Sequence, residues 1–301
     1  MILGVLGMVK DSFGDVNGDS GGVLYEKNVC ATLRKGEAAE NIPKALARGL
    51  PLLELSHDDG NADKKVVIIG GGPTLNGERM AELDSRNDVL KVVGGSSHRL
   101  LDNGVLNSAD VAVYNTPGAS YASFVEEDHG LEYWLATGCD DALFDKVSGY
   151  NVKVWDALFE DVDYAETQEL VVGSGSTAPV AALTLLIMQG YKSFEFYGVD
   201  GGGFDMILNE YTSYSVEDEH KNIPRSVLDE HVIVDTDRGV MKVATNFWNQ
   251  LQEMRLIIGE HPECSFTFHG ESLNNLVFNQ GMEIRSVYSP VQSDKPDSVL
   301  G

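Results

Sequence analysis

The sequence predicts an α/β protein built on a Rossmann-like, doubly wound and mostly parallel sheet, with a lid region and a short N-terminal extension. From residue 64 onward, short apolar runs alternate with longer segments of helical character. Clusters of small residues follow four of these runs, at 70–74, 94–97, 173–177 and 198–203. In a doubly wound sheet such clusters meet at the carboxyl ends of the strands, where ligands bind.

Three parts are expected along the chain. We divide the 301 residues into an N-terminal extension (1–60), one Rossmann-like domain (61–285) and a C-terminal tail (286–301). Within the extension, a short helix is predicted over 40–48, with Pro43 in its first turn, where proline is well tolerated.

The elements of the domain follow from apolar runs bounded by turn residues. The first run, at 66–69, is four consecutive β-branched residues and is expected to be a strand buried on both faces. Further strands are predicted at 89–93, 111–114, 133–136, 152–155, 170–172, 194–197 and 265–268. Helices are predicted at 76–85, 178–189 and 246–259. The segment of about 203–230 lacks a clear period and is predicted to be a lid; a hairpin follows, with strands at 231–234 and 240–243.

The composition limits the partners of the chain. It has 47 acidic and 22 basic residues, a formal net charge of -25, so its surface repels nucleic acids and anionic membranes. The longest apolar run, 178–188, is about half of a membrane span, and we expect no membrane insertion. Cys30, Cys139 and Cys264 have no paired spacing, which disfavours a disulfide framework and a zinc site and favours a reducing cytoplasm.

The loop after the first strand is the strongest candidate for a ligand site. Gly70, Gly71 and Gly72 let a ligand approach the backbone, Pro73 fixes the turn, and Thr74 caps the helix that follows. A glycine loop between a strand and a helix start is a ready anion site; a tight turn without a ligand is the alternative. The spacing is not G-x-G-x-x-G, and no acidic residue ends the next strand, so a nicotinamide dehydrogenase is disfavoured.

Two further small-residue loops extend the predicted edge. Gly95 and Ser96 lie in the loop after the second strand. Ser174, Gly175 and Ser176 precede a helix and form the second-best anion site, with helix capping alone as the alternative.

Two polar residues also follow strands at this edge. Asn115 is placed to hydrogen-bond a base or a sugar, or to form an Asx-turn. Asp200 is expected to hold a ribose hydroxyl, a metal ion or a lysine. We therefore include both with the predicted binding residues.

Histidine is the expected group for proton transfer. His220 and His231 flank the lid, where a base approaches a bound substrate. His98, in the second glycine loop, and His269, at the last strand end, are further candidates. The sequence has no nucleophile elbow, P-loop, H-E-x-x-H or C-x-x-C motif.

The order of four segments resembles a known family. These are VVIIGGGPTL at 66–75, VGGSSHRLLDNGV at 93–105, GSGSTAPVA at 173–181 and GYKSFEFYGVD at 190–200. With them the chain resembles the motility-associated-factor glycosyltransferases, a DUF115-like family that shares a domain with archaeal 6-hydroxymethyl-dihydropterin pyrophosphokinases. The resemblance covers roughly residues 64 to 275.

The same order is similar to bacterial lipooligosaccharide sialyltransferases, whose Tyr-Asn-Pro-like strand end matches YNTP at 114–117. This resemblance implies a nucleotide donor such as a CMP-sugar, bound by residues 70–74, Asn115 and residues 174–176. It also implies a lid histidine as the base, with His231 the nearest match by position.

We therefore expect a transferase that binds a nucleotide or nucleotide-sugar, most closely a sialyltransferase-like glycosyltransferase with an unidentified acceptor. One alternative is an ATP-dependent pyrophosphokinase acting on a pterin-like alcohol, with Mg²⁺ held by Asp200 and by Asp235 or Asp237. Another is a non-catalytic nucleotide-binding or assembly module. A homo-oligomer is left open.

Overall fold

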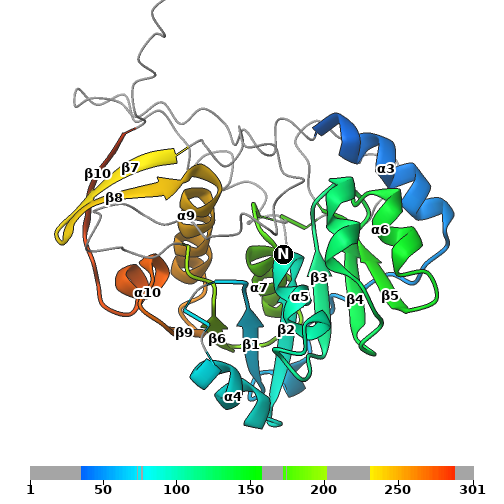
Figure 1. The fold of residues 1–301 in the computed structure, drawn as a ribbon, viewed down its shortest axis with the longest axis horizontal. Coiled ribbons are helices and arrows are strands. Elements are labelled where there is room, and N and C mark those ends of the chain that lie inside the picture. The colour runs from blue at the N-terminus through cyan, green and yellow to red at the C-terminus, as the bar shows by residue number, and fades with distance from the viewer. Residues whose placement is uncertain are drawn as a thin grey trace, which may run out of the picture.

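A computed structural model describes residues 35–72, 74–75, 77–157, 172–173, 175–201 and 231–288. Its main sheet has seven strands: β1 (Lys65–Ile69), β2 (Val89–Gly94), β3 (Val111–Tyr114), β4 (Glu132–Ala136), β5 (Asn151–Trp155), β6 (Ser193–Tyr197) and β9 (Ser265–Phe268). The spatial order is β5-β4-β3-β2-β1-β6-β9, and all neighbours in it are parallel. This confirms the predicted doubly wound α/β sheet (Figure 1).

The helices are α3 (Lys35–Ala47), α4 (Gly77–Ser85), α5 (Arg99–Asp102), α6 (Asp141–Lys146), α7 (Ala178–Met188), α9 (Thr245–Glu260) and α10 (Leu273–Phe278). Short 3₁₀ turns lie at η1 (Asp59–Asn61), η2 (Gly95–His98) and η3 (Ala119–Phe124). The predicted bounds of α4, α7 and α9 are confirmed to within one residue at each end. No helix in the described ranges is long and apolar enough to cross a membrane.

The direction in which successive strands are added to the sheet reverses between β1 and β6. The strands step away from β1 in one direction as far as β5, and the chain then returns through α7 to place β6 on the other side of β1. Because βαβ crossovers are right-handed, the two directions put α4 and α7 on opposite faces of the sheet. The place where the ends of β1 and β6 lie side by side is the topological switch point, near which such sheets bind ligands.

Helix α7 is buried because its sequence is apolar all round. Val180, Leu183 and Leu186 are each at most 1% exposed. The helix packs on β1, β2 and β3 on one side and on α9 on the other. An evenly apolar helix needs such cover on two sides.

The described part of the extension, from residue 35, covers the free edge of β5. The Leu53 amide donates to the Val154 carbonyl at 2.7 Å, and the Val154 amide donates to the Pro51 carbonyl at 2.9 Å. Pro43 lies inside α3 and not in its first turn as predicted. The helix is longer than expected. It packs on α6, and Asn41 Nδ2 donates to the carbonyl of Gly138, in the turn before α6, at 3.1 Å.

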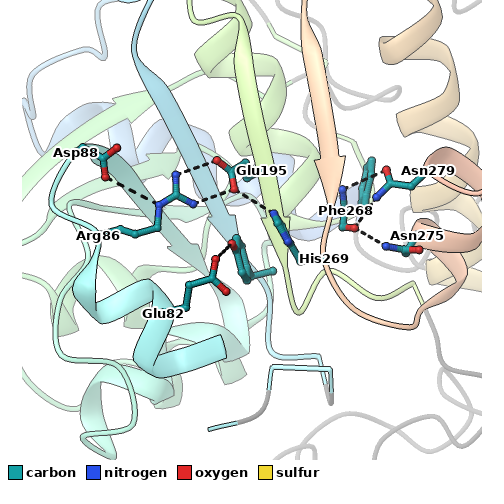
Figure 2. Close-up of polar contacts among 9 residues, drawn as sticks. Glu82, Arg86, Asp88, Glu195, Phe268, His269, Asn275 and Asn279 are labelled. Carbon is teal, nitrogen blue, oxygen red and sulfur yellow. Dashed lines mark hydrogen bonds and ion pairs between the residues drawn. The ribbon is translucent and has the colours of Figure 1, made fainter. Parts of the chain in front are cut away.

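Arg86, on the loop after α4, ties that face of the sheet together (Figure 2). Its guanidinium donates to both carboxylate oxygens of Glu195, at 2.8 and 2.9 Å, and holds the pKa of that carboxyl below its ordinary value. The ring of His269 binds the same carboxylate at 3.0 Å and stacks on Tyr197 with ring centres 4.0 Å apart. Tyr197 in turn donates to Glu82 on α4 at 2.8 Å.

The outer edge of β9 is closed by two asparagines from α10 and the turn after it (Figure 2). Asn279 accepts from the Phe268 amide at 3.3 Å and donates to the Phe268 carbonyl at 2.6 Å, and Asn275 donates to the same carbonyl. These amide groups replace the missing neighbour strand, which is how an edge is protected from pairing with another chain.

A second sheet of three antiparallel strands joins the domain. It contains β7 (His231–Thr236), β8 (Gly239–Ala244) and β10 (Ile284–Tyr288), in the order β10-β7-β8. The β7–β8 hairpin was predicted, whereas β10 was not. Its Ile284 and Val287 pack on a core cluster that includes Trp248 of α9, so apolar burial extends the fold beyond the predicted start of the tail at residue 286.

Candidate functional site

The structure brings the predicted small-residue loops together at one edge of the sheet. A Cβ on Gly71 would lie 2.9 Å from Ser96 Oγ, so the loops after β1 and β2 are in contact. A Cβ on Gly94 would lie 2.8 Å from that of Ala178, which joins the β2 end to the start of α7. Asn115 Nδ2 then donates to the Gly175 carbonyl at 3.3 Å. The loops after β1, β2 and β3 and the start of α7 thus form one continuous rim.

Gly70 and Gly72 are explained by packing within the chain. Both are buried, and a Cβ on either would overlap the Gly198 carbonyl oxygen in the loop after β6. The Gly72 amide donates to that same oxygen at 2.7 Å. None of the three loop glycines has a positive φ, so steric contact is what excludes a side chain. Gly71 is exposed, and the atoms nearest to a Cβ there are Ser96 Oγ at 2.9 Å and, at 3.8 Å, Ser96 Cβ and the Ser97 amide nitrogen.

Asp200 holds the β1 loop from the other side of the switch point. Its carboxylate accepts from the Thr74 amide at 3.0 Å and from the Thr74 hydroxyl, and the residue is 2% exposed. The segment after β9 packs against both Thr74 and Asp200. A Cβ on Gly270 would overlap Thr74, and the backbone amide of Asn274, in α10, donates to the Asp200 backbone carbonyl at 3.2 Å. Asp200 was predicted to bind a ribose hydroxyl, a metal ion or a lysine. In the structure its carboxylate accepts hydrogen bonds from a threonine of its own chain.

A carboxylate also lies at the start of α7, where an anion was expected. Glu253 Oε2, on α9, accepts from the Ser176 amide at 2.8 Å and from Ser176 Oγ at 2.7 Å. Beside it, Thr177 Oγ1 donates to Gln250 Oε1 at 2.8 Å. Burial raises the pKa of the Glu253 carboxyl above its ordinary value, against the lowering effect of the two bonds from Ser176.

The expectation for α7 did not include this internal partner. The Ser176 amide and hydroxyl, predicted to bind an external anion, bind the Glu253 carboxyl group in the structure. Sequence reasoning missed Glu253 because it lies 77 residues away on a helix of ordinary amphipathic pattern.

Two donors at the rim differ from these. Within the described residues, neither the Gly71 amide nor the Ser96 hydroxyl has a hydrogen-bonding partner, and both residues are at least partly exposed. Gly95 and Gly175, on either side, have φ of 57° and 63°, a conformation that favours glycine. Among the described residues, the loops after β1 and β2 therefore each carry an open donor.

The three candidate histidines within the described ranges lie in different surroundings. His231 is the first residue of β7, opposite Ala244. His98 is a core residue: it is fully buried, its Nδ1 bonds the Phe124 carbonyl at 2.9 Å, and burial lowers its pKa. His269 binds Glu195 on the face of the sheet. Three predicted site residues lie outside the described ranges: Pro73, Ser174 and His220.

The expected magnesium ligands are not gathered in the part of the chain that the structure describes. Asp235 lies in β7 and Asp237 in the following turn, where it accepts from the Glu283 amide at 3.0 Å. No described group of three metal-ligating residues includes Asp200, Asp235 or Asp237.

Comparison with known proteins supports the fold. The chain is similar to the structure of the MAf glycosyltransferase from Magnetospirillum magneticum AMB-1, with a TM-score of 0.56 and 17% sequence identity. The match covers 80% of this chain and 37% of that chain. The chain has the fold of part of a MAf-like glycosyltransferase. No protein-family model matches the chain, and no curated protein does. The predicted resemblance to the motility-associated family is confirmed at the level of the fold.

Replacing Glu253 by glutamine tests the buried carboxyl. Its raised pKa means that the folded chain binds this proton more tightly than the unfolded chain. Folding stability therefore falls as the pH rises from about 4.5, the ordinary glutamate value, through the folded value. Glutamine keeps an oxygen for Ser176 and carries no charge. We expect Glu253→Gln to be at least as stable as the native chain at neutral pH, with the difference vanishing below pH 4.5.

Urea denaturation at several pH values measures this effect. Glu260→Gln, an exposed change on the same helix, is the matched control and should show no such dependence. Glu253→Ala, which leaves the Ser176 amide unpaired, should lose about 1–3 kcal/mol. A glutamine variant that is less stable than the native chain at neutral pH would contradict the interpretation.

Proposed function

We propose that the chain is a transferase that binds a nucleotide or nucleotide-sugar at the rim formed by the loops after β1, β2 and β3 and the start of α7. The observation that carries the proposal is the convergence of these loops at the carboxyl edge of the sheet, beside the β1–β6 switch point near which doubly wound folds bind ligands. The similarity of the fold to a glycosyltransferase supports sugar transfer as the reaction class.

The hydrogen-bond pattern favours one place for the phosphate. A phosphate needs donors that are not already used, and the Thr74 and Ser176 amides both bind internal carboxylates. The Gly71 amide and the Ser96 hydroxyl are open donors within the described residues, and α4 starts a few residues after Gly71. We place the phosphate between these two loops and the base or sugar toward Asn115 and Gly175.

The proposed reaction is an inverting sugar transfer of the sialyltransferase-like type. The acceptor oxygen forms a bond to the anomeric carbon while the bond from that carbon to the donor phosphate breaks, and the nucleotide leaves with the electron pair. A base takes the acceptor proton, and amide donors stabilise the departing phosphate. His231 is the proposed base, with His220 the substitute.

The alternatives rank below this proposal. Phosphoryl transfer from ATP would use Mg²⁺ at Asp200, but that carboxylate binds Thr74 and lies close against Gly72. A non-catalytic nucleotide-binding or assembly module would keep the rim without a base.

A thermal-shift panel tests ligand class. It contains CMP, CMP-sialic acid, UDP-sugars, ATP and GTP, each with and without Mg²⁺. We expect a cytidine nucleotide to raise the melting temperature without Mg²⁺. Stabilisation by ATP only with Mg²⁺ would favour the pyrophosphokinase, and stabilisation by none would remove nucleotide binding. Gly71→Val should weaken the nucleotide affinity at least about tenfold, or about 1.4 kcal/mol, because its side chain enters the space beside Ser96.

Gly77→Val is the matched control, since a Cβ there meets nothing within 4 Å. Native affinity in a folded Gly71→Val chain would show that this loop does not hold the phosphate.

Turnover of the donor identified in that panel tests the base. His231→Ala should leave binding intact and lower the rate about 10²–10⁴-fold, the usual effect of losing a general base. Full turnover in His231→Ala with a dead His220→Ala would move the role to His220. Full turnover in both variants would exclude histidine catalysis at the lid.

A further inference from the structure

A second group of chemically reactive side chains lies far from the rim. His261, Glu263 and Cys264 occupy the turn between α9 and β9, at the amino end of that strand and thus at the opposite edge of the sheet. His261 Nδ1 is 3.0 Å from Glu263 Oε1, and that oxygen is 4.0 Å from Cys264 Sγ. The three ligand atoms all lie within 4.8 Å of one another.

The backbone of this turn is fixed at both ends. The Cys264 amide donates to the His261 carbonyl at 3.0 Å and closes a four-residue turn, with Pro262 at its second position. Proline is favoured at this position because its φ is already set. The His261 amide still bonds the last turn of α9, and the Ser265 amide donates to the Lys192 carbonyl at 2.7 Å. The three side chains therefore extend from a backbone that is already in place.

An imidazole nitrogen, a carboxylate oxygen and a thiolate sulfur make a donor set that suits Zn²⁺, whereas Ca²⁺ and Mg²⁺ prefer oxygen alone. In a tetrahedral zinc site the nitrogen and oxygen ligands stand about 3.3 Å apart and the oxygen and sulfur about 3.5 Å. The two distances to the Glu263 oxygen differ from these values by about half an ångström or less, and the third pair, the His261 nitrogen and the Cys264 sulfur, lies within 4.8 Å, so rotation of the side chains brings the three ligands onto one ion.

Access and charge also favour a cation. The His261 and Glu263 side chains are 28% and 51% exposed, so an ion reaches them from solvent. The net charge of -25 raises the concentration of cations near the surface. A surface His–Glu pair alone is common; the thiol as a third donor on the same turn is what distinguishes this group.

We propose that the turn of His261, Glu263 and Cys264 binds a divalent cation of the zinc class, with three protein ligands and water in the fourth position. The ion joins the end of α9 to the start of β9. The sequence disfavoured a zinc site because its three cysteines have no paired spacing, and that argument looks only for pairs of cysteines. Here a histidine and a glutamate complete the ligand set, and the site is independent of nucleotide binding at the rim.

Cobalt titration tests the site through its sulfur ligand. The full chain, free of any histidine tag and treated with a chelator and a reductant, is titrated with Co²⁺. A cobalt–thiolate bond gives a near-ultraviolet charge-transfer absorption. We expect this band in the native chain, its loss on adding Zn²⁺, and its absence in Cys264→Ser. His261→Asn should lose the band or bind about tenfold more weakly or worse.

Two control variants should keep the band. Cys30→Ser removes another cysteine, and Glu260→Gln removes a nearby exposed carboxylate on α9. Zn²⁺ should raise the melting temperature of the native chain more than that of His261→Asn, which keeps the test valid if Cys264→Ser folds poorly. No band in the native chain, a band that persists in Cys264→Ser, or native affinity in His261→Asn would each overturn the proposal.

Discussion

The packing of the β1 loop against the β6 loop is the constraint on which the proposed site depends. Gly70 and Gly72 lie against the backbone of Gly198, and the hydrogen bond from the Gly72 amide to the Gly198 carbonyl locks the contact. Asp200 then binds Thr74 on the far side of the same loop. β1 and β6 are parallel neighbours at the point where the strand order reverses, and this contact keeps their loops together at the switch point.

Two backbone amides at the carboxyl edge of the sheet bind carboxyl groups of the chain itself. Asp200 accepts from the Thr74 amide in the β1 loop, and Glu253 accepts from the Ser176 amide at the start of α7. A buried amide without an acceptor would cost about 1–3 kcal/mol, so these bonds stabilise the scaffold. The Thr74 and Ser176 amides are used in this way. The Gly71 amide and the Ser96 hydroxyl have no hydrogen-bonding partner among the described residues, and this is why we propose the phosphate site there.

Much of the fold followed from the sequence because its signals are local. The four β-branched residues at 66–69 gave β1, the evenly apolar run gave α7, and the turn at 235–239 gave the hairpin. The site was only partly predictable. Sequence position placed the loops at one edge, but a glycine required by a neighbouring loop looks the same as a glycine required by a ligand. Gly70 and Gly72 are of the first kind.

Contacts across long sequence separations carried no local signal at all. Glu253 reaches Ser176 from another helix, and β10 pairs with β7 after 47 intervening residues, from Asp237 to Glu283. The stability of two single alanine variants tests the central contact most directly. Gly72→Ala should lose about 2 kcal/mol or more in urea denaturation, because its Cβ overlaps the Gly198 carbonyl and the Asp200 carboxylate. Gly71→Ala should change stability by less than about 1 kcal/mol, since only the Ser96 side chain must move. Equal losses in the two variants, or a larger loss at Gly71, would contradict the account.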